Sequence, residues 1–168
     1  YLDYRRMKKE EEYSCNMNAD YIKTIIDMKK REPVSTIMTK HAYTVQLTDS
    51  LYQVSDLIRK HEIRHVPVME GEKLVEIVSK TDVNRLSFSG LFAGEGQVDE
   101  AVFEMLTIAQ VMSHKLRVVK GTDSIRAVAE ILAKEEFHAL PVVDDHDESK
   151  LVGIVTTTDI IRYMLEQY

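Results

Sequence analysis

The stretch from Ile37 to Leu86, IMTKHAYTVQLTDSLYQVSDLIRKHEIRHVPVMEGEKLVEIVSKTDVNRL, returns later in the chain. The second copy runs from Val111 to Met164 as VMSHKLRVVKGTDSIRAVAEILAKEEFHALPVVDDHDESKLVGIVTTTDIIRYM. Residue numbers in the two copies differ by 74 up to the Pro-Val pairs that begin at 67 and 141, and by 77 after a three-residue insertion in the second copy. A register kept over this length indicates an internal duplication.

Each copy predicts the same order of elements: strand, helix, strand, strand, helix. A Thr-Asp-Ser cluster precedes the first helix in both copies, and such clusters are typical helix starts. Apolar residues then recur at helical spacing, whereas the β-branched pieces that follow favour strands. A last helix is expected to begin near Thr81 and near Thr158. The expected strands are 43–45, 66–69 and 74–79 in the first copy and 117–119, 140–143 and 151–156 in the second.

These patterns predict a mixed α/β (α+β) fold of two β-α-β-β-α units. One unit is too small to be stable by itself, so the two are expected to pack together with pseudo-two-fold symmetry. Apolar residues at helical spacing also predict a helix over 18–31, before the first unit. The expected domain bounds are 1–33 for a charged helical segment, 34–90 for repeat 1, 91–107 for a linker and helix, and 108–168 for repeat 2.

Composition and charge restrict the function. The chain has 168 residues, 44% of them hydrophobic and 30% charged, which is ordinary for a globular protein. Its net charge of −6 argues against a nucleic-acid-binding domain, since such domains are usually basic. No apolar run approaches the roughly 18–20 residues of a membrane span, and the N-terminus lacks the apolar core of a secretory signal. With Cys15 as the single cysteine, we expect a soluble, cytoplasmic protein, although a start at Tyr1 rather than Met is compatible with a longer one.

The pentapeptide HEIRH at 61–65 matches H-E-x-x-H, in which one helix places two histidines on the same face to bind zinc. The repeat alignment instead places His61 at a helix end and His65 at the start of a strand, with Pro67 two residues later. The second copy reads EEFHA at 135–139 and lacks the pair. We interpret the match as accidental and expect no metal site. A hydrolase or metalloenzyme that uses it is kept as an alternative, which stoichiometric zinc would support.

The segment EIVSKTD at 76–82 aligns with GIVTTTD at 153–159. In both, a strand ends in a hydroxyl residue, Ser79 or Thr156, and Asp82 or Asp159 follows three positions later at a helix start. A helix N-terminus offers free N–H groups to an anion, and a hydroxyl can donate to a phosphate oxygen. A carboxylate only accepts, so it suits the 2′- and 3′-hydroxyls of a ribose. The same residue types also cap helices, so a nucleotide site and plain capping both remain open.

The doubled V-x-x-[IV]-M, T-D-S-[LI], [VL]-P-V and G-I-V-T-T-T-D elements, over about residues 34–165, resemble a tandem CBS domain pair, the Bateman module. In that family the signature G-h-h-[ST]-x-x-[DN] binds adenosyl ligands in clefts between the two repeats. The resemblance implies phosphate contacts for Ser79 and Thr156 and ribose contacts for Asp82 and Asp159. It further implies that Arg64 and His138, with His65 beside Arg64, face the phosphates. The implied walls of the adenine site are Met38, Tyr43, Val66, Met112 and Leu140.

The two copies differ at one position of this signature. The second copy has the usual glycine, Gly153, whereas the first carries Glu76, which adds bulk and negative charge. If only one cleft is occupied, we therefore expect it to be the one that uses Thr156 and Asp159.

The resemblance implies a regulatory module and not an enzyme. Its ligand would be AMP, ADP, ATP or S-adenosylmethionine, with no required cofactor, and a homodimer and an unidentified effector protein are the implied partners. The alternative is a structural dimerisation module without a ligand, in which the S/T-x-x-D residues only cap helices.

Overall fold

The structure is a computed structural model that describes residues 23–24, 31–88, 105–110, 116–135 and 137–167. Most of the expected N-terminal helix over 18–31 and most of the expected linker and helix over 91–107 lie outside the described residues. The described strands form two sheets, with the orders β1-β7-β6-β5 and β2-β3-β4.

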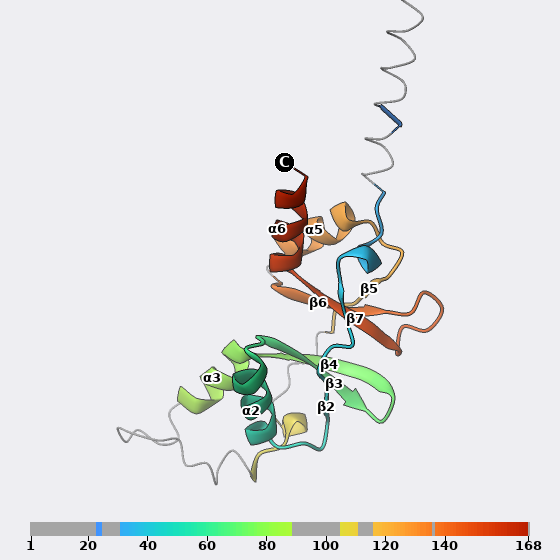
Figure 1. Ribbon diagram of the computed structural model, residues 1–168. Helices are drawn as coiled ribbons and strands as arrows, with labels where there is room; N and C mark the ends of the chain where they lie inside the picture. The colour runs from blue at the N-terminus through green and yellow to red at the C-terminus, as the bar shows by residue number, and fades with distance from the viewer. Residues whose placement is uncertain (1–22, 25–30, 89–104, 111–115, 136, 168) are drawn as a thin grey trace, which may run out of the picture.

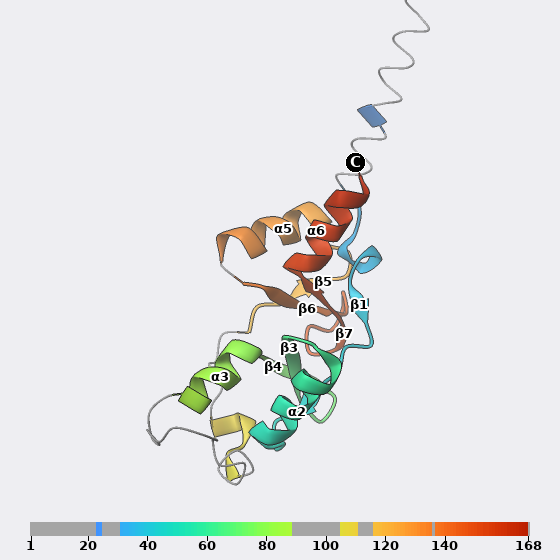
Figure 2. The same ribbon diagram turned by 60° about the vertical axis from the view of Figure 1, so that its left-hand side comes forward.

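Both repeats have the predicted order of elements. Repeat 1 contains β2 (Val45–Gln46), α2 (Leu51–His61), β3 (His65–Glu70), β4 (Lys73–Ser79) and α3 (Lys80–Phe88). Repeat 2 contains β5 (Val119–Lys120), α5 (Ile125–Lys134), β6 (Ala139–Val143), β7 (Leu151–Thr156) and α6 (Thr157–Glu166). In Figures 1 and 2, α2 and α3 lie at one end of the molecule, α5 and α6 at the other, and the two sheets lie between them. The predicted mixed α+β fold is confirmed.

The helix starts predicted from the Thr-Asp-Ser clusters are also observed. Ser50 caps α2 by accepting a hydrogen bond from the Gln53 N–H at 3.3 Å, and Ser124 caps α5 by accepting one from the Ala127 N–H at 3.2 Å. Such a cap satisfies one of the donors that a helix start leaves free. The serine of each cluster therefore determines where its helix begins.

The leading segment of repeat 1, before β2, belongs to the sheet and core of repeat 2. It forms η1 (Val34–Thr36) and β1 (Thr39–Lys40), and β1 pairs antiparallel with β7. The Val34 side chain has 0% exposure and lies in the core of repeat 2. The Val34 N–H donates to the Asp123 carbonyl oxygen at 2.7 Å, just before α5.

The leading segment of repeat 2, before β5, makes the corresponding contacts with repeat 1. It contains η2 (Ile108–Gln110), whose Ile108 has 0% exposure and lies in the core of repeat 1. The Ile108 N–H donates to the Asp49 carbonyl oxygen at 3.2 Å. Ile108 and Asp49 align with Val34 and Asp123 in the duplication, so the contact is repeated with the copies interchanged. The two repeats thus exchange their leading segments.

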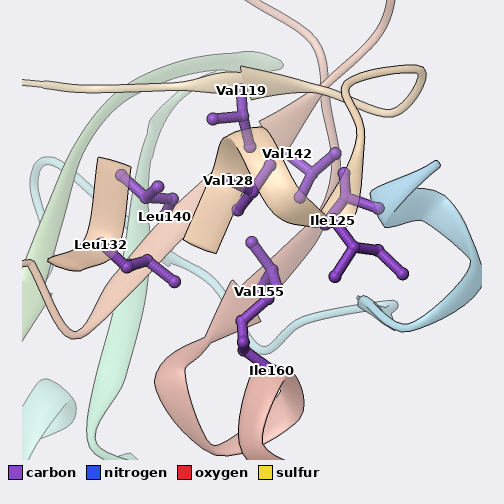
Figure 3. Packing of buried hydrophobic residues seen from close by; sticks show 9 residues of the cluster. Val119, Ile125, Val128, Leu132, Leu140, Val142, Val155 and Ile160 are labelled. Carbon is purple, nitrogen blue, oxygen red and sulfur yellow. The ribbon is translucent and has the colours of Figure 1, made fainter. Parts of the chain in front are cut away.

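Each repeat has its own hydrophobic core between helices and sheet. Figure 3 shows the repeat 2 core, where Val128 and Leu132 of α5 pack with Val155 of β7 and Ile160 of α6. Fully burying one such side chain stabilises the fold by about 1.5–3 kcal/mol. The buried residues of the repeat 1 core are Val45, Val54, Ile58, Val66, Val68, Val78, Val83 and Ile108.

Close packing of β1 against β7 explains the glycine at 153. Gly153 pairs with Lys40 of β1, and a Cβ at Gly153 would lie 2.8 Å from the Met38 Sδ and 2.8 Å from the Thr39 carbonyl oxygen. The methionine could move, but the carbonyl oxygen belongs to the paired strand and cannot move without disturbing it. Only a residue without a side chain fits.

We expect Gly153→Ala to destabilise the protein by about 1–3 kcal/mol, the usual cost of overpacking. Gly121→Ala is the matched control, because a Cβ there would make only an ordinary contact, 3.6 Å from the Ser35 Cβ. Urea unfolding of both variants measures the difference. A Gly153→Ala protein as stable as Gly121→Ala would contradict the close packing of β1 on β7.

Candidate functional site

Thr156 and Asp159 form a capping box at the start of α6. The Thr156 Oγ1 donates to the Asp159 Oδ2 at 2.7 Å and accepts from the Asp159 N–H at 3.3 Å. The Thr156 N–H donates to the same carboxylate oxygen at 2.8 Å. These bonds hold the carboxylate in a fixed position where β7 ends and α6 begins.

Ser79 and Asp82 form the same arrangement between β4 and α3. The Ser79 hydroxyl donates to the Asp82 Oδ2 at 2.5 Å, and the Ser79 N–H donates to that oxygen at 3.1 Å. The Asp82 N–H in turn donates to the Ser79 hydroxyl at 3.1 Å. Both S/T-x-x-D motifs therefore act as helix caps in this structure, as the capping interpretation of the sequence requires.

This bonding limits what the hydroxyls can offer a ligand. A hydroxyl has one hydrogen, and in both boxes that hydrogen is donated to the aspartate. A phosphate oxygen only accepts, so it gains a bond from Thr156 only when the hydroxyl turns away from Asp159. The second carboxylate oxygen has a different environment, since the Asp159 Oδ1 lies 3.6 Å from an Arg162 guanidinium nitrogen. A carboxylate oxygen accepts more than one bond, so this atom retains capacity for a ribose hydroxyl.

Two candidate phosphate-binding residues from different repeats, His65 and His138, lie close enough to influence each other electrostatically. Arg64 and His65 precede and begin β3, and His138 precedes β6 of the other repeat. Burial lowers the pKa of His65, and the nearby His138 and Arg64 lower it further, whereas Asp82 acts in the opposite direction. The Arg64 carbonyl oxygen accepts from the Lys80 N–H at 2.8 Å, which fixes this loop to the start of α3. The basic cluster of Arg64, His65 and His138 thus lies where β3 and β6 begin, with His65 opposite Ser79 of the Asp82 motif.

The residues expected to line an adenine site lie in different surroundings. Met38 is half-buried and packs beside Gly153 of β7, the strand that ends at Thr156. Tyr43 is 48% exposed, and its ring stacks on His61 with centroids 3.9 Å apart. Val66 and Leu140 have 0% and 1% exposure and belong to the two cores, so in this arrangement they offer no surface to a ligand. Met112 lies outside the described residues.

The stacking of Tyr43 on His61 was not expected from the sequence. No local signal could have indicated it, because the two rings belong to the segment before β2 and the end of α2. Stacked rings with one partly exposed face present a flat apolar surface, which is the type of surface that a purine base prefers.

The HEIRH segment does not form a continuous helix. α2 ends at His61, Glu62 adopts the left-handed conformation with φ 53°, and His65 is the first residue of β3. The two histidines therefore do not share a helix face, as predicted from Pro67. Within the described ranges, no group of three or more His, Cys, Asp or Glu side chains could hold a metal ion. None of the described helices is long and apolar enough to cross a membrane.

Glu76 is the residue of repeat 1 that takes the place of Gly153. It is 4% exposed and lies opposite Val68 of β3, as Gly153 lies opposite Val142 of β6. One carboxylate oxygen accepts from the Ile77 N–H at 3.1 Å. The two halves of the molecule therefore differ in bulk and polarity within the strand that leads to each S/T-x-x-D motif.

Comparison with known proteins identifies a family and several relatives of this chain. The family model described as CBS domain matches residues 34–89 and 108–166. Homoserine O-acetyltransferase from Methanocorpusculum labreanum is 30% identical over 125 residues, 74% of this chain and 22% of that protein. An uncharacterized protein of Methanocaldococcus jannaschii, MJ0188, is 33% identical over 135 residues, 80% of this chain and 44% of that protein. This chain thus spans less than half the length of either relative.

Among solved structures, a similar one is the CBS domain pair of protein MJ0100 in complex with 5′-methylthioadenosine and S-adenosyl-L-methionine. It has a TM-score of 0.64 and 26% sequence identity, and the match covers 81% of this chain and 98% of that one.

We expect the stability of this protein to fall as the pH drops below 6.5, with His65 as one cause. The pKa of folded His65 lies below its ordinary value of 6.5, so the unfolded chain binds more protons in this range and unfolding becomes easier. His65→Ala, which places the residue of the aligned position Ala139 there, should lose less stability between pH 7.5 and 5.5 than the parent protein. Urea unfolding at both pH values measures this, with the exposed His146→Ala as control. If the parent and His65→Ala lose the same unfolding free energy between pH 7.5 and 5.5, His65 is not a cause of the pH dependence.

Proposed function

This chain belongs to the CBS domain family, and we propose that it is a regulatory module that binds an adenosyl compound between its two repeats. Ligand binding would change how the repeats, or two copies of the chain, pack together, and a partner protein or domain would respond to that change. A ligand shifts such an equilibrium only by the difference between its affinities for the two arrangements. The proposed role is regulatory, without a catalytic step in this chain.

The observation that carries the proposal is the fixed carboxylate of Asp159 at the junction of β7 and α6. Its Oδ2 accepts two bonds from Thr156, and its Oδ1 retains capacity for a donor pair. A ribose diol is such a pair. The similar structure of the MJ0100 domain pair was solved with two compounds that contain this diol. Both facts support an adenosyl ligand as the signal.

We assign the residues of the site as follows. Asp159 and Asp82 accept from ribose hydroxyls, and Thr156 and Ser79 hold these carboxylates in place. Arg64 and His138, which come from different repeats, face the phosphates when the ligand has them. Met38 and Tyr43 are the proposed adenine contacts that this arrangement leaves accessible or partly accessible. If one cleft is preferred, it is that of Asp159, because Glu76 adds a buried carboxyl group on the other side.

The proposed setting is a cytoplasmic homodimer that acts on an effector protein or on another domain of a longer chain. The longer curated relatives support a module within a longer chain, because this chain matches only 22% of the homoserine O-acetyltransferase and 44% of MJ0188.

One observation favours a second candidate, a structural dimerisation module without a ligand. Both S/T-x-x-D motifs have all of their capping bonds in place, so each has a sufficient role in the fold alone. The two candidates differ in a single measurable property, the binding of adenosyl compounds.

We expect S-adenosylmethionine, 5′-methylthioadenosine, AMP, ADP or ATP to raise the melting temperature of the full chain. A ligand at about 100 times its dissociation constant stabilises by ~2.7 kcal/mol, which corresponds to roughly 5–10 °C for a chain of this size. Stabilisation by the phosphate-free compounds alone would indicate that the basic cluster is not used. The absence of a shift with all five would favour the structural module.

We expect Asp159→Asn to weaken binding of the stabilising ligand about 10- to 100-fold, and Asp82→Asn to weaken it less. Asparagine can still accept from the Thr156 N–H, so the cap is largely kept, whereas a hydrogen bond to a charged acceptor, of about 1.5–3 kcal/mol, is lost. Titration calorimetry measures the affinities. Asp123→Asn is the control, since that carboxylate accepts only from the Lys120 N–H outside the motif. Equal loss of affinity in the Asp159 and Asp82 variants would mean that Glu76 does not make the two clefts differ in ligand binding.

A further inference from the structure

A hydrogen bond between residues far apart in sequence joins α6 to the segment that leads into η1. The Tyr163 hydroxyl donates to the Glu32 Oε2 at 2.7 Å, in partly buried surroundings. The Tyr163 ring packs against the repeat 2 core, which holds its hydroxyl in place. The bond to Glu32, together with burial, raises the pKa of Tyr163 to about 12, so the phenol keeps its proton and remains a donor near neutral pH. Figure 2 shows the described chain that leads into η1 beside α6.

Glu32 contacts two further elements besides α6. Its carbonyl oxygen accepts from the Ile125 N–H at 2.8 Å, at the start of α5. Its Oε1 accepts from the Thr36 hydroxyl in η1 at 3.3 Å. Glu32 therefore joins η1, α5 and α6, and it does so directly after residues 1–31 in the sequence.

The duplication keeps the backbone contact of Glu32 but not its side-chain contact. In repeat 1, the Leu51 N–H donates to the Leu106 carbonyl oxygen at 2.9 Å, which is the contact corresponding to that of Glu32. The residues aligned with Glu32 and Tyr163 are Leu106 and Leu86, whose side chains form no hydrogen bonds. The leading segment of a repeat can thus dock without a polar pair at these positions. The Tyr163–Glu32 bond is specific to the half that has the complete G-I-V-T-T-T-D signature.

Tyr163 lies one helical turn after Asp159 in α6, and residues four apart are neighbours on one face of a helix. Thr156 holds Asp159 at one end of this turn, and Glu32 holds Tyr163 at the other. Both contacts need α6 in the same position. A ligand that binds Asp159 and orders the start of α6 therefore lowers the cost of forming the Tyr163–Glu32 bond. The reverse also holds, because coupling between two sites is reciprocal.

We propose that the Tyr163–Glu32 bond couples the ligand site at Asp159 to the N-terminal side of the chain, so that ligand binding and this bond strengthen each other. Tyr163 is a positioning residue, since it acts on the ligand through α6 without touching it. The inference rests on the proposed function and deepens it, because it names the contact through which a bound adenosyl compound acts beyond the two repeats. An effector would then respond to the chain on the N-terminal side of Glu32.

The first test is the affinity of the full chain for AMP, ADP, ATP, S-adenosylmethionine and 5′-methylthioadenosine, by titration calorimetry. We expect Tyr163→Phe, which keeps the ring in the core, and Glu32→Leu, which introduces the aligned residue of repeat 1, each to weaken binding about 3- to 10-fold. The double variant should lose no more affinity than either single variant, because both changes remove the same bond. Glu32→Gln should lose less, since its amide oxygen can still accept from the phenol.

Tyr52→Phe is the matched control for this test. It removes the same hydroxyl group from a tyrosine in α2 of repeat 1, and it should keep the parent affinity. Circular dichroism checks that every variant remains folded.

The second test is a readout that a purely structural role of Tyr163 would not change. The amides of Val34 and Ile125 form hydrogen bonds on either side of Glu32, and NMR measures their hydrogen exchange with and without the bound compound. We expect the compound to slow this exchange in the parent protein. In Tyr163→Phe, at a concentration that saturates the variant, the exchange should stay unchanged.

Two outcomes would overturn this proposal and leave the adenosyl site intact. One is a Tyr163→Phe protein that binds with the parent affinity, and the other is a ligand effect on the Val34 and Ile125 amides that is equal in the two proteins. If the parent protein binds none of the five compounds, the proposed function fails first and the coupling fails with it. The two failures are therefore distinct.

Discussion

The exchange of leading segments between the repeats is the constraint on which the rest of the structure depends. Repeat 2 takes β1 as the edge strand of its sheet and Val34 as part of its core, and repeat 1 takes Ile108 into its own core. Because each repeat is completed by the leading segment of the other, neither has a full core by itself. The folding unit is thus the pair of repeats. The exchanged segments also fix the positions of the two junctions, where β4 meets α3 and where β7 meets α6.

The exchange also changes the meaning of the family signature. Its glycine, Gly153, is required because β1 passes close to β7, and its hydroxyl and acidic residues cap a helix. Most of the signature therefore has a structural reason before any ligand binds. What packing does not explain is the free capacity of the second carboxylate oxygen and the gathering of Arg64, His65 and His138 from both repeats. These features carry the functional proposal.

The sequence predicted the order of elements well, because the duplication and the apolar spacing are local and repeated signals. It could not predict the exchange, since β1 has two residues and no periodicity, and its partner β7 lies far along the chain. Val66 and Leu140 show a similar limit: a strand pattern indicates apolar residues but not whether they face the core or a cleft, and both face the core. For HEIRH, by contrast, Pro67 and the second copy were enough to predict that no continuous helix forms.

The exchange is tested most directly by hydrogen–deuterium exchange in Val34→Ala and Ile108→Ala, two changes of fully buried residues. Val34 belongs to repeat 1 in sequence, but we expect its truncation to speed amide exchange most in β6 and β7 of repeat 2. Truncation of Ile108 should act most on β3 and β4 of repeat 1. If each change instead affects mainly the repeat to which it belongs in sequence, the leading segments are not exchanged, and each repeat completes its own core.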